Sequence, residues 1–247
     1  MQPWVSAFHS KWRTLTNALL ITCIIPTRNR PDYIAESAAS VLAQDHSNLE
    51  LIIVNDGEIA VPEFDDRRVR ILNSGQAGAV PARNLGAAQA KGDAIAWLDD
   101  DDVWTDTHFL SACVDSLNAE SDFVFGAGDL VFPDGTRKAF AKNASPESLR
   151  QDNTILISAV CYRRSLHHSL GMFDTSLPYY WDWDWYLRVA HAGHLMTRLV
   201  TPVVDIRIHQ NNMSGTTNAE ARAANLQLLC DKHGLPKIQL KSHIDFV

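Results

Sequence analysis

Residues 20–57 read LITCIIPTRNRPDYIAESAASVLAQDHSNLELIIVNDG, and this stretch decides the fold. Two apolar runs, Leu20–Ile25 and Leu49–Asn55, enclose a helical pattern over Asp32–Ala43. The second run contains four consecutive aliphatic residues, as expected for a strand that helices cover on both faces of a parallel sheet. Pro31 suits the first position of the helix, because its missing N–H costs nothing there. The stretch therefore predicts a βαβ unit.

The same alternation continues downstream of this unit. Further apolar runs and helical patterns follow at Val69–Leu72, Val80–Ala90 and Ala94–Leu98. Sheets of this kind bind ligands in the crevice outside the carboxyl ends of their strands. Polar clusters that follow the strands are therefore candidates for one shared site, and they are Pro26–Arg30, Asn55–Gly57 and Asp99–Asp102.

Beyond residue 103 the pattern becomes a mixture of helices and strands. Helical patterns are expected near Thr107–Leu117, from Asp182 onward and over Ala219–Lys232. Apolar runs lie at Phe123–Phe132, Thr154–Tyr162 and Val203–Ile208. Pro133–Gly135 predicts a turn, and the polar stretch Ala141–Asn153 predicts a loop or a short helix. The sequence has no internal repeat or low-complexity linker, so we expect the second half to pack directly on the first.

Composition is that of an ordinary globular protein and argues against a broad nucleic-acid surface. The 247 residues carry 29 acidic and 22 basic side chains, a net charge of −7, whereas phosphate-backbone binding needs clustered Lys and Arg. The four cysteines are widely spaced and include no C-x-x-C pair. That pattern is typical of small buried thiols in a reducing compartment, so we expect a cytoplasmic protein.

The N-terminal stretch carries an aromatic stripe. Trp4, Phe8 and Trp12 recur at helical spacing and predict one face of a helix. We expect this face to pack on the protein's own body, and a peripheral membrane contact stays open. No segment approaches the roughly 20 apolar residues of a transmembrane helix, so we expect no membrane span.

Four consecutive carboxylates, Asp99–Asp102, follow the buried run Ala94–Leu98. Adjacent like charges repel, so this tract is destabilising unless solvent or a cation neutralises it. A hard divalent cation bound through carboxylate oxygen and substrate phosphate would neutralise it. In an extended segment Asp99 and Asp101 share one face and Asp100 points to the other, which suits two different ligand groups. A solvated loop or a helix N-terminus is the alternative, above all for Asp102.

The ordered motifs resemble those of the inverting nucleotide-sugar glycosyltransferases of family two, which have the GT-A fold. The resemblance spans roughly residues 20–215. Five motifs carry it: Ile24–Arg30 (IIPTRNR), Glu50–Gly57 (ELIIVNDG), Pro81–Gly86 (PARNLG), Trp97–Asp102 (WLDDDD) and Trp181–Arg188 (WDWDWYLR). It implies an α/β fold whose mostly parallel central sheet is flanked by helices and continues into an acceptor-side αβ half.

The resemblance also implies a division of one continuous domain. The N-terminal extension is 1–19, the nucleotide-sugar-binding half is 20–102, and the acceptor-binding and catalytic half is 103–215. A C-terminal helical tail, 216–247, is expected to cover the acceptor site or to mediate self-association, and homo-oligomerisation stays open.

For the donor, the resemblance implies a nucleotide-sugar site. Pro26 and Thr27 match the turn that lies against the base and ribose. Asp56 matches the acceptor of an imide N–H, which favours a UDP- or dTDP-sugar, although guanine also offers an N–H edge. The predicted donor-binding residues are Pro26, Thr27, Arg28, Arg30, Asp56, Arg83, Asn84, Asp99 and Asp100. Arg83 has a simple ion pair as its alternative role.

A metal site and a catalytic base follow from the same resemblance. Asp101 matches the metal ligand for Mn²⁺ or Mg²⁺, and His209 is a candidate second ligand whose alternative is a structural role. Asp182 matches the general base that takes the proton of an acceptor hydroxyl, helped by partial burial that raises its pKa.

The segment around the base departs from the family pattern. Trp181 stands where the family usually has Glu, which leaves open whether Asp184 rather than Asp182 faces the acceptor. Trp181 and Trp183 are candidates to stack on an acceptor sugar, with core packing as the alternative. Asp184 also has the i, i+4 spacing of a helix ion pair with Arg188.

We therefore expect inverting, metal-assisted glycosyl transfer to a carbohydrate, lipid-linked or small-molecule acceptor. A nucleotidyltransferase is one alternative, but Thr27–Arg30 lacks the glycines of its phosphate loop. The other alternative is a carbohydrate-binding or regulatory module without catalytic activity. The strongest argument for it is Trp181, which stands where the family usually has Glu.

Overall fold

The fold is taken from a computed structural model, which describes residues 19–209, 212, 219–241 and 243–247. The expected helix that carries Trp4, Phe8 and Trp12 lies outside the described residues. Within the described ranges, no helix combines the length and the apolar character needed to cross a membrane.

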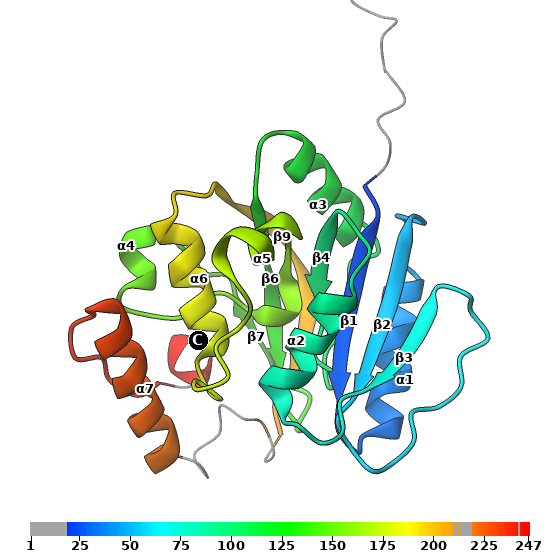
Figure 1. The fold of residues 1–247 in the computed structure, drawn as a ribbon, viewed down its shortest axis with the longest axis horizontal. Coiled ribbons are helices and arrows are strands. Elements are labelled where there is room, and N and C mark those ends of the chain that lie inside the picture. The colour runs from blue at the N-terminus through cyan, green and yellow to red at the C-terminus, as the bar shows by residue number, and fades with distance from the viewer. Residues whose placement is uncertain (1–18, 210–211, 213–218, 242) are drawn as a thin grey trace, which may run out of the picture.

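The described residues contain nine strands that form one sheet (Figure 1). They are β1 (Ile21–Thr27), β2 (Leu49–Asn55), β3 (Val69–Asn73), β4 (Ala94–Trp97), β5 (Val103–Trp104), β6 (Phe123–Val131), β7 (Arg137–Phe140), β8 (Val160–Arg163) and β9 (Met196–Arg207). Their order is β3-β2-β1-β4-β8-β6-β9-β5, and β7 pairs with β6. The first four strands in this order run parallel, as predicted, and β8 is antiparallel to both β4 and β6. The sheet thus continues across both halves of the sequence.

Helices cover both faces of this sheet. They are α1 (Pro31–Leu42), α2 (Ala79–Gln89), α3 (Phe109–Asn118), α4 (Pro146–Leu149), α5 (Ser165–Leu170), α6 (Trp181–His191) and α7 (Ala219–His233), with 3-10 turns at Ile157–Ala159 (η1) and His243–Phe246 (η3). Successive strand side chains point to opposite faces. Ile24 and Val54 therefore join a core with α2, α6 and α7, whereas Cys23 and Ile53 join a second core with α1 and α3. This explains the run of aliphatic residues in β2.

Two expectations about the second half need correction. The run Thr154–Tyr162 is interrupted by η1, and only its end belongs to β8. The turn brings the Ser158 hydroxyl to the acidic tract, where it donates to Asp102 at 2.5 Å. The strand expected at Val203–Ile208 begins earlier, at Met196, and ends at Arg207, because backbone pairing with β6 extends it through residues that are half-buried or exposed.

A buried carboxylate ties the C-terminal helix to α6. Asp184 is fully buried, and its oxygens lie 2.8 Å from Nε2 of His233, 2.7 Å from Nζ of Lys232 and 3.0 Å from Nε of Arg188. Burial opposes ionisation of Asp184, but the hydrogen bonds from His233 and Lys232 and the charge of Arg188 outweigh it and lower the pKa. The helix pair expected between Asp184 and Arg188 is present, and α7 adds the Lys232 ammonium and the His233 ring to it.

Close packing of α2 on the sheet depends on one glycine. A Cβ atom at Gly86 would lie 2.6 Å from Cγ2 of Ile24 and 3.2 Å from Cγ2 of Val54. Both neighbours belong to buried strands and cannot move without disturbing the core. Gly86 therefore sets the distance between α2 and the strands that carry the donor motifs.

We predict that Gly86→Val lowers the free energy of unfolding by about 1–3 kcal/mol, because overpacking forces α2 away from the sheet. The matched control is Ala88→Val, which adds the same side chain on the exposed face of α2. Its expected loss is about 0.5 kcal/mol, the helix propensity of Val. Urea titration at constant m-value measures both, and equal losses would contradict the packing argument.

Candidate active site

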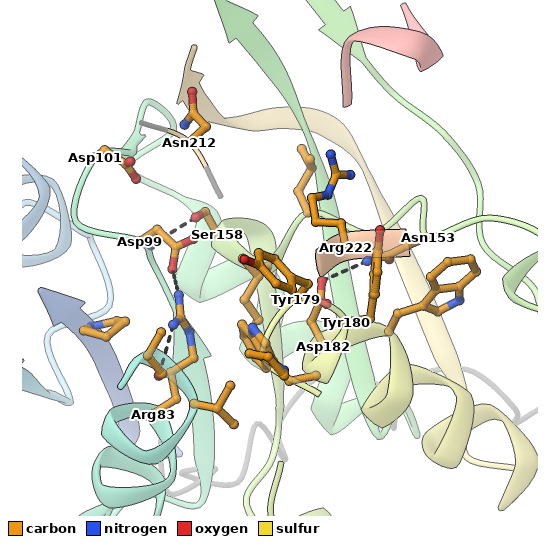
Figure 2. A pocket seen from close by; sticks show the side chains of 18 of the residues that line it. Arg83, Asp99, Asp101, Asn153, Ser158, Tyr179, Tyr180, Asp182, Asn212 and Arg222 are labelled. Atoms are coloured by element: carbon orange, nitrogen blue, oxygen red, sulfur yellow. Dashed lines mark hydrogen bonds and ion pairs between the residues drawn. The ribbon is translucent and has the colours of Figure 1, made fainter. Parts of the chain in front are cut away.

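One cavity of about 670 Å³ opens at the carboxyl ends of β1, β2 and β4 and continues between α6 and the C-terminal tail (Figure 2). Parallel strands deliver the side chains that follow them to one edge of the sheet, so motifs far apart in sequence meet there. The predicted site residues that line the cavity are Pro26, Thr27, Arg28, Arg30, Asp56, Arg83, Asp99, Asp100, Asp101, Trp181, Asp182 and Trp183.

The acidic tract follows β4 directly and is held by hydroxyl groups from other elements. The amide of Asp99 donates to Oγ of Ser158 at 3.0 Å. Oγ of Ser37, on α1, lies 2.6 and 2.7 Å from the carbonyl oxygens of Asp100 and Asp102. These contacts fix the backbone of the tract, so its carboxylates are aimed before any ligand binds.

Three carboxylates of the tract converge. Oxygens of Asp99, Asp101 and Asp102 lie within 4.8 Å of one another. Burial raises the pKa of Asp102, and the charges of Asp101 and Asp99 raise it further. Mn²⁺ and Mg²⁺ prefer hard oxygen ligands, and a bound cation would relieve the repulsion between these carboxylates.

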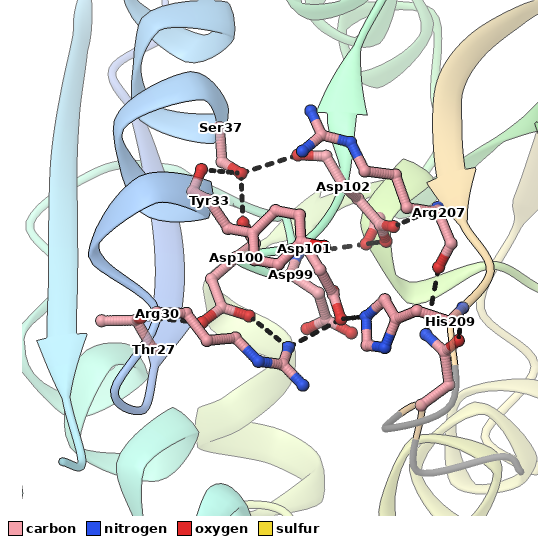
Figure 3. A network of polar contacts seen from close by, with 12 residues as sticks. Thr27, Arg30, Tyr33, Ser37, Asp99, Asp100, Asp101, Asp102, Arg207 and His209 are labelled. Atoms are coloured by element: carbon pink, nitrogen blue, oxygen red, sulfur yellow. Dashed lines mark hydrogen bonds and ion pairs between the residues drawn. The ribbon is translucent and has the colours of Figure 1, made fainter. Parts of the chain in front are cut away.

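Two cationic or polar groups converge on Asp101 (Figure 3). Nη1 of Arg30 lies 2.7 Å from Oδ2 of Asp101 and 3.0 Å from Oδ1 of Asp100. Nε2 of His209, just after β9, lies 2.8 Å from the same Oδ2 of Asp101. The structure therefore places His209 at the tract, where it contacts the predicted metal ligand.

One part of the cavity is lined by residues at the carboxyl ends of β1 and β2, including Thr27 and Asp56. Oγ1 of Thr27 donates to Oδ2 of Asp100 at 2.7 Å. Asp56 is 3% exposed, and its Oδ1 accepts from Oγ of Ser74 at 2.5 Å and from the amide of Gly78 at 3.1 Å. These bonds hold the Asp56 carboxylate at the cavity wall in one orientation.

Asp182 lies in the first turn of α6, across the cavity from Asp99 and Asp101 (Figure 2). It is half-buried, and Nδ2 of Asn153 donates to its Oδ2 at 2.8 Å. Burial raises the pKa of Asp182 to about 6, against the opposing effects of the Asn153 hydrogen bond and the Arg83 charge. A carboxyl group with this pKa can accept a proton near neutral pH.

Asn84 and Asp184, predicted for the donor and acceptor sites, are not among the residues that line the cavity. The Asn84 amide bonds to the backbone of Phe173 in both directions, at 2.9 and 3.0 Å. Asp184 is enclosed by Arg188 and by the side chains of Lys232 and His233. The two aromatic candidates, Trp181 and Trp183, do line the cavity but are 5% and 4% exposed.

The cavity is also lined by residues that the sequence did not single out, among them Asn153, Ser158, Arg222 and Lys241. Ser158 had a usable signal, because it is a polar residue inside an apolar run. Asn153 sits in a stretch interpreted as a loop or short helix, and nothing local connects it to Asp182. Arg222 and Lys241 belong to the tail, and only its folding back onto α6 brings them here.

Comparison with known sequences identifies the family. Glycosyl transferase family 2 matches residues 22–171. The uncharacterized glycosyltransferase YwdF of Bacillus subtilis is 33% identical, over 90% of this chain and 87% of YwdF. Escherichia coli WfgD, named a UDP-Glc:alpha-D-GlcNAc-diphosphoundecaprenol beta-1,3-glucosyltransferase, is 27% identical over 68% of each chain. The chain spans only 32% of a 26% identical glycosyltransferase of Rickettsia bellii.

Solved structures share the fold. TarS of S. aureus in complex with UDP-GlcNAc superimposes with a TM-score of 0.67 and 17% identity, over 86% of this chain and 66% of that chain. The mannosyltransferase PcManGT from Pyrobaculum calidifontis, in complex with GDP-Man and Mn²⁺, gives 0.64 and 17%, over 88% and 64%. Because the family match covers more than half of the chain and the YwdF match nearly all of it, the chain belongs to glycosyl transferase family 2 and is a glycosyl-transferring enzyme with the GT-A fold.

Proposed function

We propose that this cavity transfers a sugar, with inversion, from a nucleotide diphosphate to an acceptor hydroxyl, with Asp182 as the general base. One observation carries the proposal: a single cavity joins the acidic tract after β4 to a half-buried carboxyl group whose pKa is raised to about 6. A donor site and a proton acceptor are the two parts that single-displacement transfer needs.

The donor occupies the end of the cavity formed after β1, β2 and β4, and a UDP- or dTDP-sugar is favoured. The fixed Asp56 carboxylate supports this choice, because it would accept the imide N–H of uracil or thymine. TarS was solved with UDP-GlcNAc and PcManGT with GDP-Man, so guanine is the competing base to test.

Asp99, Asp101 and Asp102 would hold a divalent cation, Mn²⁺ or Mg²⁺, with His209 supporting Asp101. The close approach of their oxygens supports this, as does the Mn²⁺ in PcManGT. When bound, such a cation supplies positive charge that stabilises the diphosphate leaving group. Asp100, held by Thr27 and Arg30, is assigned to the donor ribose.

At the other end, Asp182 takes the proton of the acceptor hydroxyl. As that proton leaves, the acceptor oxygen bonds to the anomeric carbon, and the bond from this carbon to the diphosphate breaks on the opposite side. Asn153 orients the carboxyl group through its 2.8 Å hydrogen bond. The family match favours this reaction over nucleotidyl transfer, which would break a bond within a triphosphate.

The acceptor enters beside the C-terminal tail. Arg222, Leu226, Ile238 and Lys241 line this end of the cavity and mix apolar with cationic groups. This mixture is compatible with a carbohydrate, lipid-linked or small-molecule acceptor, and the name of WfgD describes a lipid-linked one.

The four cysteines are buried and free, which supports a reducing, cytoplasmic setting.

Asp182→Asn should abolish transfer while leaving donor binding within about twofold of wild type, because removing a general base costs about 10²- to 10⁴-fold in rate. Calorimetry with UDP and Mn²⁺ measures binding, and single-turnover assays over an acceptor panel measure transfer. Asp231→Asn, an exposed carboxylate on α7, is the control and should retain activity. Full transfer by Asp182→Asn would refute the assignment of the base.

The pH dependence of wild-type kcat/KM for the acceptor should report the same group. Protonated Asp182 cannot accept a proton, so activity is expected to rise with pH through about 6 and to level off above it. Below that pH the rate should fall about tenfold per unit. A profile that is flat between pH 5 and 7 would exclude a base with this pKa.

Asp101→Asn should remove the metal-dependent part of nucleotide binding. We expect UDP with Mn²⁺ to raise the Tm of wild type more than UDP alone, and EDTA to reverse the difference. In Asp101→Asn the two conditions should give the same Tm, because one charged oxygen ligand is lost. Asp115→Asn, exposed on α3, should behave as wild type. A full Mn²⁺ effect in Asp101→Asn would place the metal elsewhere.

A further inference from the structure

A stacked pair of side chains bridges the two ends of the cavity. The guanidinium of Arg83, on α2, lies over the indole of Trp181, the first residue of α6, at 4.5 Å from the ring centroid. Arg83 also forms an ion pair with Asp99, and its Nη1 donates to the carbonyl of Ala79 at 3.2 Å. Both partners are at least 94% buried, so the contact is shielded from water.

The indole is itself held in place. Phe173 packs edge-on against Trp181 at 4.7 Å between ring centroids. The backbone of Phe173 is fixed to α2 by the Asn84 amide, whose side chain accepts from its N–H and donates to its carbonyl. Arg83, Trp181, Phe173 and Asn84 therefore form a closed ring of contacts. This ring gives Asn84 a role in the site without direct contact with the cavity.

An indole and a carboxylate at position 181 would act differently on Arg83. A carboxylate would place a second negative charge beside the guanidinium, which already pairs with Asp99. An aromatic face attracts the cation through its quadrupole and adds no further negative charge. Among the described residues, Nε of Arg83 is buried and has no hydrogen-bond partner, so the ring face takes the place of a polar contact there.

The position of this charge matters for both substrates. Arg83 contacts Asp99 in the acidic tract, and Trp181 is adjacent in sequence to Asp182. The guanidinium therefore lies between the two ends, where the diphosphate of a bound donor would approach the reacting sugar. A planar guanidinium is well suited to bind phosphate oxygens.

We propose that Trp181 is a positioning residue for the donor diphosphate: by stacking on Arg83 without adding a second carboxylate beside Asp99, the indole aims the guanidinium at the phosphate nearest the sugar. The inference rests on the proposed donor site. It differs from simple core packing, in which Trp181 would stabilise the fold and have no energetic coupling to Arg83 in ligand binding.

The test is a double-mutant cycle with UDP and UMP, each with Mn²⁺, as calorimetric probes. The measured quantity is the ratio of UDP to UMP affinity, which isolates the terminal phosphate. Trp181→Leu and Trp181→Glu should lower this ratio about tenfold, and Trp181→Phe, which keeps an aromatic face, should retain it within about threefold. Arg83→Met should lower it as well, and adding Trp181→Leu to Arg83→Met should cause no further loss.

Trp183→Leu is the matched control, because Trp183 lines the same cavity but donates its indole N–H to the Leu149 carbonyl. It should reduce stability and leave the UDP to UMP ratio unchanged. Additive losses from Trp181→Leu and Arg83→Met, or an equal loss of UDP and UMP affinity in Trp181→Leu, would overturn the role of Trp181. Failure of wild type to bind UDP, dTDP or GDP would instead refute the proposed donor site.

Discussion

Four carboxylates in consecutive positions at the end of a buried strand are the constraint around which this site is built. Asp100, Asp101 and Asp102 are each less than 10% exposed, so water cannot screen their repulsion. Hydrogen-bond donors and cationic groups from many elements contact the tract and stabilise it. Thr27 ends β1 and Arg30 follows it, Ser37 comes from α1, Arg83 from α2, Ser158 from η1, and His209 follows β9. The need to stabilise one charged tract thus gathers the elements that line the donor end.

Two acidic residues on α6 illustrate how partners, rather than burial alone, decide the state of a carboxyl group. Asp182 is half-buried and receives one amide hydrogen bond, and its pKa is raised to about 6. Asp184, fully buried two residues later, is surrounded by Arg188, Lys232 and His233, and its pKa is lowered. The first is suited to accept a proton. Asp184 stays charged and anchors α7. The first turn of α6 therefore carries both the proposed base and the residue that holds α7 in place.

The C-terminal tail packs against the segments around Asp182 and completes the wall of the cavity there. Tyr179 donates its backbone N–H to Asn225 of α7 at 3.0 Å, and Lys241 pairs with Asp152 at 2.5 Å. These contacts place tail residues across from Asp182, beyond the segment that the family match covers. Substitutions in this tail would therefore alter the part of the cavity lined by Arg222 and Lys241.

The sequence by itself determined the parallel half of the sheet and the donor motifs, because both follow from short-range patterns: the aliphatic runs of β1 and β2, Pro31 at the start of α1, and the carboxylates directly after β4. It also indicated Asp182 by resemblance to a family. The tertiary structure was needed to show which oxygens of the tract converge, that Asn84 bonds to the backbone of Phe173, that Asp184 contacts Lys232 and His233 of α7, and that Trp181 stacks on Arg83. Those outcomes depend on contacts between residues up to about a hundred positions apart, which no local pattern records. The hydrogen bond between His209 and Asp101, 108 positions apart, is such a contact, since it forms only once β9 has paired with β6.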